Sequence, residues 1–230
     1  MSTIAKTPPA VHYPDFDGLP IADNTLQFEW IVTTQGNLDL LFREREDVFV
    51  AGDHLIYPVE GDPNTRQAPD VYVAFGRPKG HRGSYKVFDE DNVFPQVVFE
   101  VWSPGNRFTQ MEDKRDFYAR YGAEEYYIVY PEFPAHLDGW RRDNGGLVRV
   151  AEMDGHVSPR LGIRFELRRG NVAIFRPDGR RFLSYVELGA LQQETEARAT
   201  TAEHQAEEAR QKAERLAARL RELGVDPDNV

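Results

Sequence analysis

Two acidic residues lie in apolar surroundings, 30 residues apart in the sequence. Glu100 stands inside the apolar run 97–102, which follows Pro95 and is typical of a buried strand. Asp70 opens a second apolar run, 71–75. A carboxylate on a buried strand loses its hydration and therefore needs a partner, a proton or a metal ion. Two such residues on core-forming strands predict a metal-dependent active site.

The alternation of side chains along a strand decides which residues can meet. Glu100 shares a strand face with Val98, and Asp70 shares one with Tyr72. If the two strands are neighbours in the sheet, both carboxylates can converge on one side, where each would raise the pKa of the other. Mg²⁺ or Mn²⁺ would relieve this repulsion and takes oxygen ligands of this kind, and the carbonyl of Val101 is a further candidate ligand.

A lysine lies on the next predicted helix, on the face expected to pack against the sheet. Met111, Lys114, Tyr118 and Tyr121 recur at spacings of three and four residues, and Gly122 is a natural end of the helix. A lysine on such a face either extends outward to water or meets a buried anion. Beside a carboxylate pair with a metal ion, Lys114 would orient an attacking water or stabilise charge on a phosphate.

The composition limits the class of protein. The chain has 230 residues, of which 40% are hydrophobic, enough for one domain with an appendage. It contains no cysteine, which excludes disulfides and thiolate metal sites. No apolar stretch has the length of a membrane span, and residues 1–14 lack the apolar core of a secretory signal. These features predict a soluble, cytoplasmic protein without membrane partners.

The formal net charge of −10 argues against non-specific coating of DNA, because backbone binding needs Lys and Arg. Local basic clusters occur in the loop 77–86 and at Arg141 and Arg142. Each is either solvated surface or a rim that faces a substrate.

The remaining segments predict an α/β or α+β fold with a mixed sheet and helices beside it. Residues 1–20 are rich in proline and predict an extended arm. Asp23 or Asn24 would cap a first helix, and a separate helical piece, 37–44, would follow a break at Gly36. The further predicted strands are 48–50, 54–57, 126–130, 147–151, 163–167 and 172–175.

The tail has a different pattern. From Glu194 to Leu223 it contains neither Gly nor Pro, and small or apolar residues alternate at steps of three and four. The seam consists of Ala199, Ala202, Ala206, Ala209, Ala213, Leu216, Leu220 and Leu223. This heptad pattern is typical of a coiled-coil-like helix and favours a homo-oligomer, a dimer in the simplest case. A single solvated helix, or one packed on its own domain, is the alternative.

Several motifs together resemble a known family. They are 69–71, 97–104, the helix positions Lys114, Tyr118 and Gly122, and the strand 125–131, in this order and spacing. This set is similar to the putative restriction endonuclease family within the PD-(D/E)xK nuclease superfamily. The similarity extends over residues 20–185 and leaves the tail outside.

The resemblance implies a restriction-endonuclease-like core, a mixed sheet flanked by helices, and Mg²⁺-dependent hydrolysis of phosphodiester bonds in DNA. Asp70 takes the place of the metal-binding Asp and Glu100 that of the second acidic ligand. The superfamily lysine usually lies two residues after that acid, where this chain has Trp102, and in this family it maps to Lys114. The implied catalytic residues are Asp70, Glu100 and Lys114, and the implied metal ligands are Asp70, Glu100 and Val101.

The chain departs from the family pattern at two positions. An Asp is common four residues before the lysine and before the proline that ends the next strand, and this chain has Gln110 and Tyr130 there. An acid of the N-terminal helix often completes such sites, and Glu29 is a weak candidate for it.

We therefore expect an N-terminal arm (1–20), a nuclease domain (21–187) and a C-terminal heptad helix with a short tail (188–230). The leading hypothesis is a metal-dependent endonuclease that acts on DNA. The alternative is a catalytically weakened nuclease-fold protein that acts as an oligomeric interaction module. Gln110 and the acidic net charge favour this alternative.

Overall fold

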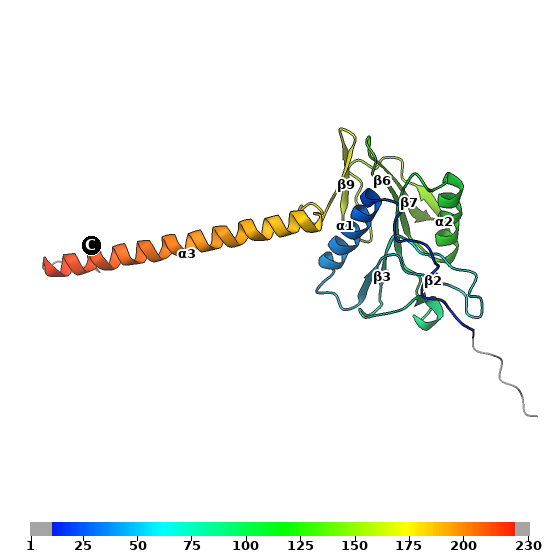
Figure 1. Cartoon of the computed structure of the whole chain (residues 1–230), viewed down its shortest axis with the longest axis horizontal. Coiled ribbons are helices and arrows are strands. Elements are labelled where there is room, and N and C mark those ends of the chain that lie inside the picture. The colour runs from blue at the N-terminus through cyan, green and yellow to red at the C-terminus, as the bar shows by residue number, and fades with distance from the viewer. Residues whose placement is uncertain (1–10, 224–230) are drawn as a thin grey trace, which may run out of the picture. The chain divides into compact units, whose positions relative to one another are not determined.

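The computed structural model describes residues 11–223, which form two compact units that meet in the sequence between Phe182 and Leu183 (Figure 1). The elements of the first unit are α1 (Thr25–Leu41), β1 (Val48–Ala51), β2 (Ile56–Tyr57), β3 (Val71–Phe75), β4 (Tyr85–Lys86), a 3₁₀ turn (Val87–Asp89), β5 (Val97–Val101), α2 (Phe108–Tyr121), β6 (Glu125–Tyr130), β7 (His136–Asp143), β8 (Gly146–Arg149), β9 (Arg164–Arg168) and β10 (Asn171–Phe175). The second unit contains α3 (Tyr185–Glu222).

A mixed sheet forms the centre of the first unit. Within the described residues its strand order is β1-β3-β5-β6-β7-β8, and β5 and β6 run parallel while the other neighbours are antiparallel. Helix α1 packs against one face, where Ile31 and Leu38 belong to the same hydrophobic cluster as Val97, Phe99 and other valines of the sheet. Helix α2 packs against the opposite face, where its residues Met111 and Tyr118 are buried (Figure 1). The predicted class, a mixed sheet flanked by helices, is confirmed.

Helix α1 begins where the sequence predicted. The side chain of Asn24 accepts a hydrogen bond from the backbone N–H of Gln27, as an N-cap residue does. The predicted break at Gly36 is wrong, because α1 continues to Leu41. A glycine inside a helix costs only about 1 kcal/mol, and the buried Leu38 beyond it keeps the helix on the sheet.

Three assignments of strands were wrong or missing. The strand predicted at 54–57 is shorter, β2 (Ile56–Tyr57), and it forms a separate parallel pair with β4. Strand β4 was not predicted. Strand β7 was not predicted, since its charged sequence hides the alternation that buries Leu137 and Gly139 against β6. The strand also includes the basic pair Arg141 and Arg142.

Helix α2 ends as predicted. Gly122 is its C-cap, with φ of 123°, a conformation that residues with a Cβ rarely adopt. Its N–H donates to the carbonyl of Tyr118. The chain can therefore turn at once into β6, which lies beside β5 in the sheet.

The second unit is a single long helix over its described residues. Helix α3 begins with a capping box in which Ser184 and Glu187 exchange hydrogen bonds. It runs for 38 residues, and none of them is buried. Residues 1–10 of the predicted arm and 224–230 of the predicted tail lie outside the described residues. No described helix is both long and apolar enough to cross a membrane.

Candidate active site

Strands β3 and β5 bring Asp70 to the end of β5. They pair antiparallel with Val71 opposite Phe99, so Asp70, one residue before β3, lies near Glu100 and Val101. The Val101 amide donates a hydrogen bond of 2.5 Å to Asp70 Oδ2. The two predicted strands are thus neighbours, as the convergence of the carboxylates requires.

Lys114 meets a buried anion and does not extend outward. Its Nζ donates to Glu100 Oε2 at 2.7 Å. The hydroxyl of Tyr118, one helical turn later on α2, donates to Glu100 Oε1 at 2.7 Å. The Glu100 side chain is only 1% exposed, and that of Lys114 is 22% exposed. Both carboxylate oxygens of Glu100 are therefore held from α2.

Burial and charge set the protonation of this cluster. Burial raises the pKa of Asp70 to about 8, and the charge of Glu100 adds to the effect while Lys114 opposes it. Burial acts to lower the pKa of Lys114, but the charges of Glu100 and Asp70 outweigh it and raise that pKa. Burial, with the charge of Glu100, also raises the pKa of Tyr118 well above its usual range, so its phenol remains a donor. Lys114 is therefore the fixed cation of the site.

Helix α1 reaches the same region through an amide. Gln27 is buried, and its Nε2 donates to the carbonyl of Val101 at 2.8 Å. Glu29 was the weak candidate for a residue of this helix, and the structure contradicts that assignment. It is exposed, and within residues 11–223 its side chain has no hydrogen-bond or ion-pair partner. Two residues span about 200° of a helix, so Glu29 points away when Gln27 points inward.

A cavity of about 240 Å³ opens beside this cluster. Asp70, Lys114 and Gln27 line it, together with Asp17 and Asp53 from irregular segments. Partial burial raises the pKa of Asp53, and the charge of Asp17 adds to this. Among the charged residues that line the cavity, four are aspartates and one is a lysine.

The turn before β2 fixes the backbone of Asp70. The Asp53 amide donates to the carbonyl of Pro69 at 3.1 Å, and Asp53 adopts a positive φ of 45°. A Cβ on Gly52 would lie 2.6 Å from the Asp70 carbonyl oxygen, so glycine permits this close approach. Sequence reasoning missed Asp53 because a Gly-Asp pair after a strand is also an ordinary turn signal.

The donors of the site fit a hard divalent cation. Among the described residues no group of three or more His, Cys, Asp and Glu side chains is arranged to hold a metal ion. The available ligands are two carboxylates, those of Asp70 and Glu100, and the carbonyl of Val101. Mg²⁺ keeps several waters and needs few protein ligands, so this small set suffices.

The residues that depart from the family pattern have structural roles. Gln110 accepts a hydrogen bond of 2.8 Å from the Arg107 amide and so helps to begin α2. Trp102, at the usual position of the superfamily lysine, packs its ring against Phe108 and Tyr130. These side chains have contacts that stabilise the fold, and Lys114 is the cation that pairs with Glu100.

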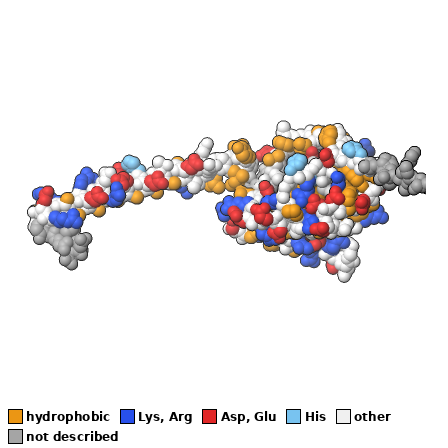
Figure 2. Space-filling view, turned by 90° about the horizontal axis from the view of Figure 1, so that it is seen from below, with side chains coloured by type: hydrophobic (Ala, Val, Ile, Leu, Met, Phe, Trp, Pro, Cys, Tyr) orange, Lys and Arg blue, Asp and Glu red, His pale blue; other side chains and the backbone are white. Residues whose placement is uncertain are grey.

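The basic loop 77–86 is largely engaged in ion pairs. Arg82 pairs with Glu90 at 2.5 Å, and Arg77 pairs with Asp91 at 2.7 Å. Figure 2 shows acidic and basic side chains interspersed over the visible face of the first unit. These pairs favour the interpretation of this loop as surface over that of a substrate-facing rim.

The first unit thus has a mixed sheet, one helix on each of its faces, and acids near the ends of β3 and β5. The model of the Uma2 family, described as putative restriction endonuclease, matches residues 23–206. The chain belongs to this family. The resemblance noted in the sequence is thereby confirmed.

One solved structure with a similar chain is a crystal structure of a putative nuclease belonging to DUF820 from Anabaena variabilis ATCC 29413. It is 10% identical, with a TM-score of 0.44 over 59% of this chain and 72% of that chain. At this level the likeness carries no argument about function. No curated protein matches the chain.

Proposed function

We propose that this protein is a divalent-metal-dependent endonuclease that hydrolyses phosphodiester bonds in DNA. The observation that supports the proposal is the geometry at the end of β5. A buried Glu100 is held by Lys114 and Tyr118, and Asp70 lies beside it at a cavity of about 240 Å³. Membership of the putative restriction endonuclease family agrees with this chemistry.

Asp70, Glu100 and the Val101 carbonyl would hold Mg²⁺ or Mn²⁺. When bound, the cation supplies charge neutralisation at the phosphate and lowers the pKa of a coordinated water. Gln27 donates to the Val101 carbonyl and fixes its orientation. Tyr118 fixes Glu100 from the other side.

The side chain of Lys114 has two roles in this proposal. Its ammonium group pairs with the buried Glu100, because a buried charge without a partner is costly. It also lines the cavity, where its ammonium group can donate to the water that attacks or to a phosphate oxygen. A water that attacks phosphorus forms the new P–O bond and loses its proton to solvent or to a nearby carboxylate; the P–O bond to the leaving oxygen breaks, and that oxygen takes up a proton from solvent.

The test is cleavage of plasmid and of single-stranded DNA in Mg²⁺ or Mn²⁺. We expect the wild type to cleave, and Asp70→Asn, Glu100→Gln and Lys114→Ala each to lose at least two orders of magnitude in rate. Glu29→Gln is the matched control, because this exposed glutamate should be neutral. A wild type that is inactive with both metals, or full activity in Asp70→Asn, would contradict the proposal.

We also propose that α3 pairs with α3 of a second copy of the chain. All of its residues are exposed or partly exposed, and its small and apolar residues keep the heptad spacing. Apolar seams of this type stabilise a helix by burying its a and d positions against a partner. Alanines bury little surface, so the dimer is expected to be weak and its population to depend on concentration.

The charges beside the seam favour a parallel pair. With Ala199 at position a, the g positions are Arg198, Gln205, Lys212 and Arg219. An antiparallel pair would bring these mostly basic positions together. In a parallel pair Arg198 faces Glu203 of the other helix, an attractive contact that competes with the ion pair of Arg198 and Glu194 within α3.

Sedimentation over a range of concentrations tests the pairing. We expect the full chain to form a dimer, and a chain that ends at Leu188, or one with Leu216→Glu and Leu220→Glu, to remain a monomer. Gln211→Glu, at an outer heptad position, is the control. Equal masses for all variants would contradict the pairing. An inactive core that still forms dimers would support the alternative function, an oligomeric interaction module.

A further inference from the structure

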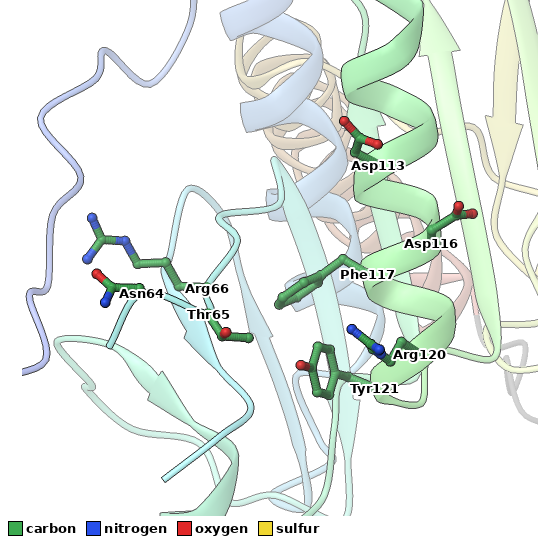
Figure 3. A pocket seen from close by; sticks show the side chains of 8 residues that line it. All are labelled: Asn64, Thr65, Arg66, Asp113, Asp116, Phe117, Arg120 and Tyr121. Carbon is green, nitrogen blue, oxygen red and sulfur yellow. The ribbon is translucent and has the colours of Figure 1, made fainter. Parts of the chain in front are cut away.

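A second cavity adjoins the candidate active site. It has a volume of about 460 Å³ and lies between the segment 64–66 and helix α2. Figure 3 shows the rings of Phe117 and Tyr121 projecting from α2 towards the segment that carries Thr65. The size is within the range of pockets that bind one small molecule.

The two elements that line the second cavity also line the first, together with other segments. Segment 64–66 lines the second cavity, and the next residues, Gln67, Ala68 and Asp70, line the first. On α2, Lys114 lines the first cavity, and Phe117 and Tyr121 line the second. Phe117 and Tyr121 follow Lys114 by about 5 and 10 Å along the helix axis. A strand bound at Asp70 and Lys114 can therefore place a neighbouring nucleotide there.

The charge of the second cavity does not fit a phosphate. Arg66 and Arg120 line it, but so do Asp113 and Asp116, so the formal charges balance. A site for phosphate would have an excess of Lys and Arg. A balanced set of donors and acceptors beside aromatic rings is suited to an uncharged, planar group with hydrogen-bonding edges.

Polar groups with no partner surround the rings. In the part of the chain that the structure describes, the side chains of Asn64, Asp113 and Arg120 and the hydroxyl of Tyr121 have no hydrogen-bond partner. Together they offer both donors and acceptors, as the edge of a nucleobase requires. The Phe117 and Tyr121 rings lie 4.8 Å apart at an angle of 59° and provide an aromatic wall.

We propose that this cavity binds one unpaired nucleobase of the DNA strand whose neighbouring phosphate lies at Asp70 and Lys114. The inference rests on the proposed nuclease function and narrows its substrate to DNA with an unpaired nucleotide beside the cleaved bond. Aromatic rings bind single-stranded bases by stacking with little dependence on sequence. A base inside a duplex is stacked and paired, so it would have to lose both interactions before it could enter this cavity, whereas an unpaired base does not.

Binding of oligonucleotides without divalent metal tests the inference apart from catalysis. Labelled single-stranded DNA of twelve nucleotides is titrated with the full chain, and one abasic site is moved along the oligonucleotide. We expect the abasic site to weaken binding roughly tenfold at one position, the size of one lost stacking contact, and to have little effect elsewhere. In Tyr121→Leu and Phe117→Leu the penalty at that position should disappear.

Two further variants make the outcome unambiguous. Arg120→Ala changes an exposed side chain and should also reduce the penalty without affecting folding. Phe28→Leu, an exposed ring on α1 at the opposite face of the sheet, should keep the full penalty. Thermal melting confirms that each variant is folded.

The inference is overturned if the abasic site has the same effect at every position, if Tyr121→Leu and Phe117→Leu keep the penalty, or if the wild type does not bind the oligonucleotide. The nuclease proposal has its own readout. If DNA is cleaved but the abasic site has no position-specific effect on binding, the nuclease proposal stands and the base-binding inference is wrong. If the abasic site weakens binding at one position but DNA is not cleaved, the base-binding inference stands and the nuclease proposal is wrong.

Discussion

Substitution of Asp70 by asparagine should stabilise the metal-free protein at high pH. Burial and the charge of Glu100 raise the pKa of Asp70 from 3.8 to about 8. A raised pKa means that the folded state holds a proton that the unfolded chain has already released. The stability from this group is therefore complete below about pH 4 and is lost as the pH rises to about 8. Asparagine has no charge to bury and keeps an oxygen that can accept from the Val101 amide.

The size of the effect follows from the shift. A pKa difference of about 4 between the folded and unfolded states corresponds to on the order of 5 kcal/mol of stability that the wild type loses by pH 9. We expect Asp70→Asn to recover at least half of it. For a domain of this size, 1 kcal/mol changes Tm by about 2–4 °C. Asp70→Asn should thus melt at least about 5 °C above the wild type at pH 9, and near the same temperature at pH 4.

The assay is thermal unfolding of the full chain at pH 4 and pH 9, with EDTA and then with Mg²⁺. Mg²⁺ should raise the Tm of the wild type at pH 9, because a ligand of the folded state alone stabilises it, and should change Asp70→Asn much less. Glu29→Gln should behave as the wild type. If Asp70→Asn is no more stable than the wild type at pH 9, or gains equally at pH 4, the reasoning about the buried carboxylate pair is refuted.

Three other perturbations test the same cluster. Lys114→Met leaves Glu100 buried without its cation, so the free energy of unfolding in urea should fall by about 3–5 kcal/mol. Adding Glu100→Gln to this variant should restore much of that loss, and additive losses in the double variant would contradict the pairing. Tyr118→Phe and Gln27→Leu each remove one buried hydrogen bond and should each cost about 1–3 kcal/mol, and stability unchanged in either would show that the bond is dispensable. Because Mg²⁺ competes with the proton on Asp70, raising its concentration should move the acidic limb of the pH–rate profile to lower pH, and a limb that stays fixed would exclude Asp70 as its source.

The alternation of strands and the periodicity of helices were readable from the sequence. They placed Glu100 on a core strand, Asp70 at the start of another and Lys114 on the inner face of α2, and they predicted a helix cap at Asp23 or Asn24. Each of these depends on contacts among residues that are close in the chain, where geometry repeats every two or 3.6 residues. The motifs taken together, in their order and spacing, indicate the Uma2 family, although no single motif does so.

The choice between similar polar residues needed the tertiary structure. Gln27 and Glu29 are equally compatible with the start of α1, and only the docking of this helix on the sheet turns Gln27 towards Val101. Asp53 approaches Asp70 because a turn 17 residues earlier folds against its backbone. Sequence spacing contains no signal for either contact.

The sequence by itself determined which faces of the predicted elements are apolar, most of the core strands and helices, and that one acid lies within a core strand and another directly before the next. The tertiary structure decided that Lys114 pairs with Glu100, that β2 joins β4 and not β1, and that two cavities adjoin along α2. The physical reason is the distance along the chain over which each interaction acts. Local backbone geometry fixes the direction of a side chain, whereas its partner is fixed by how distant elements pack.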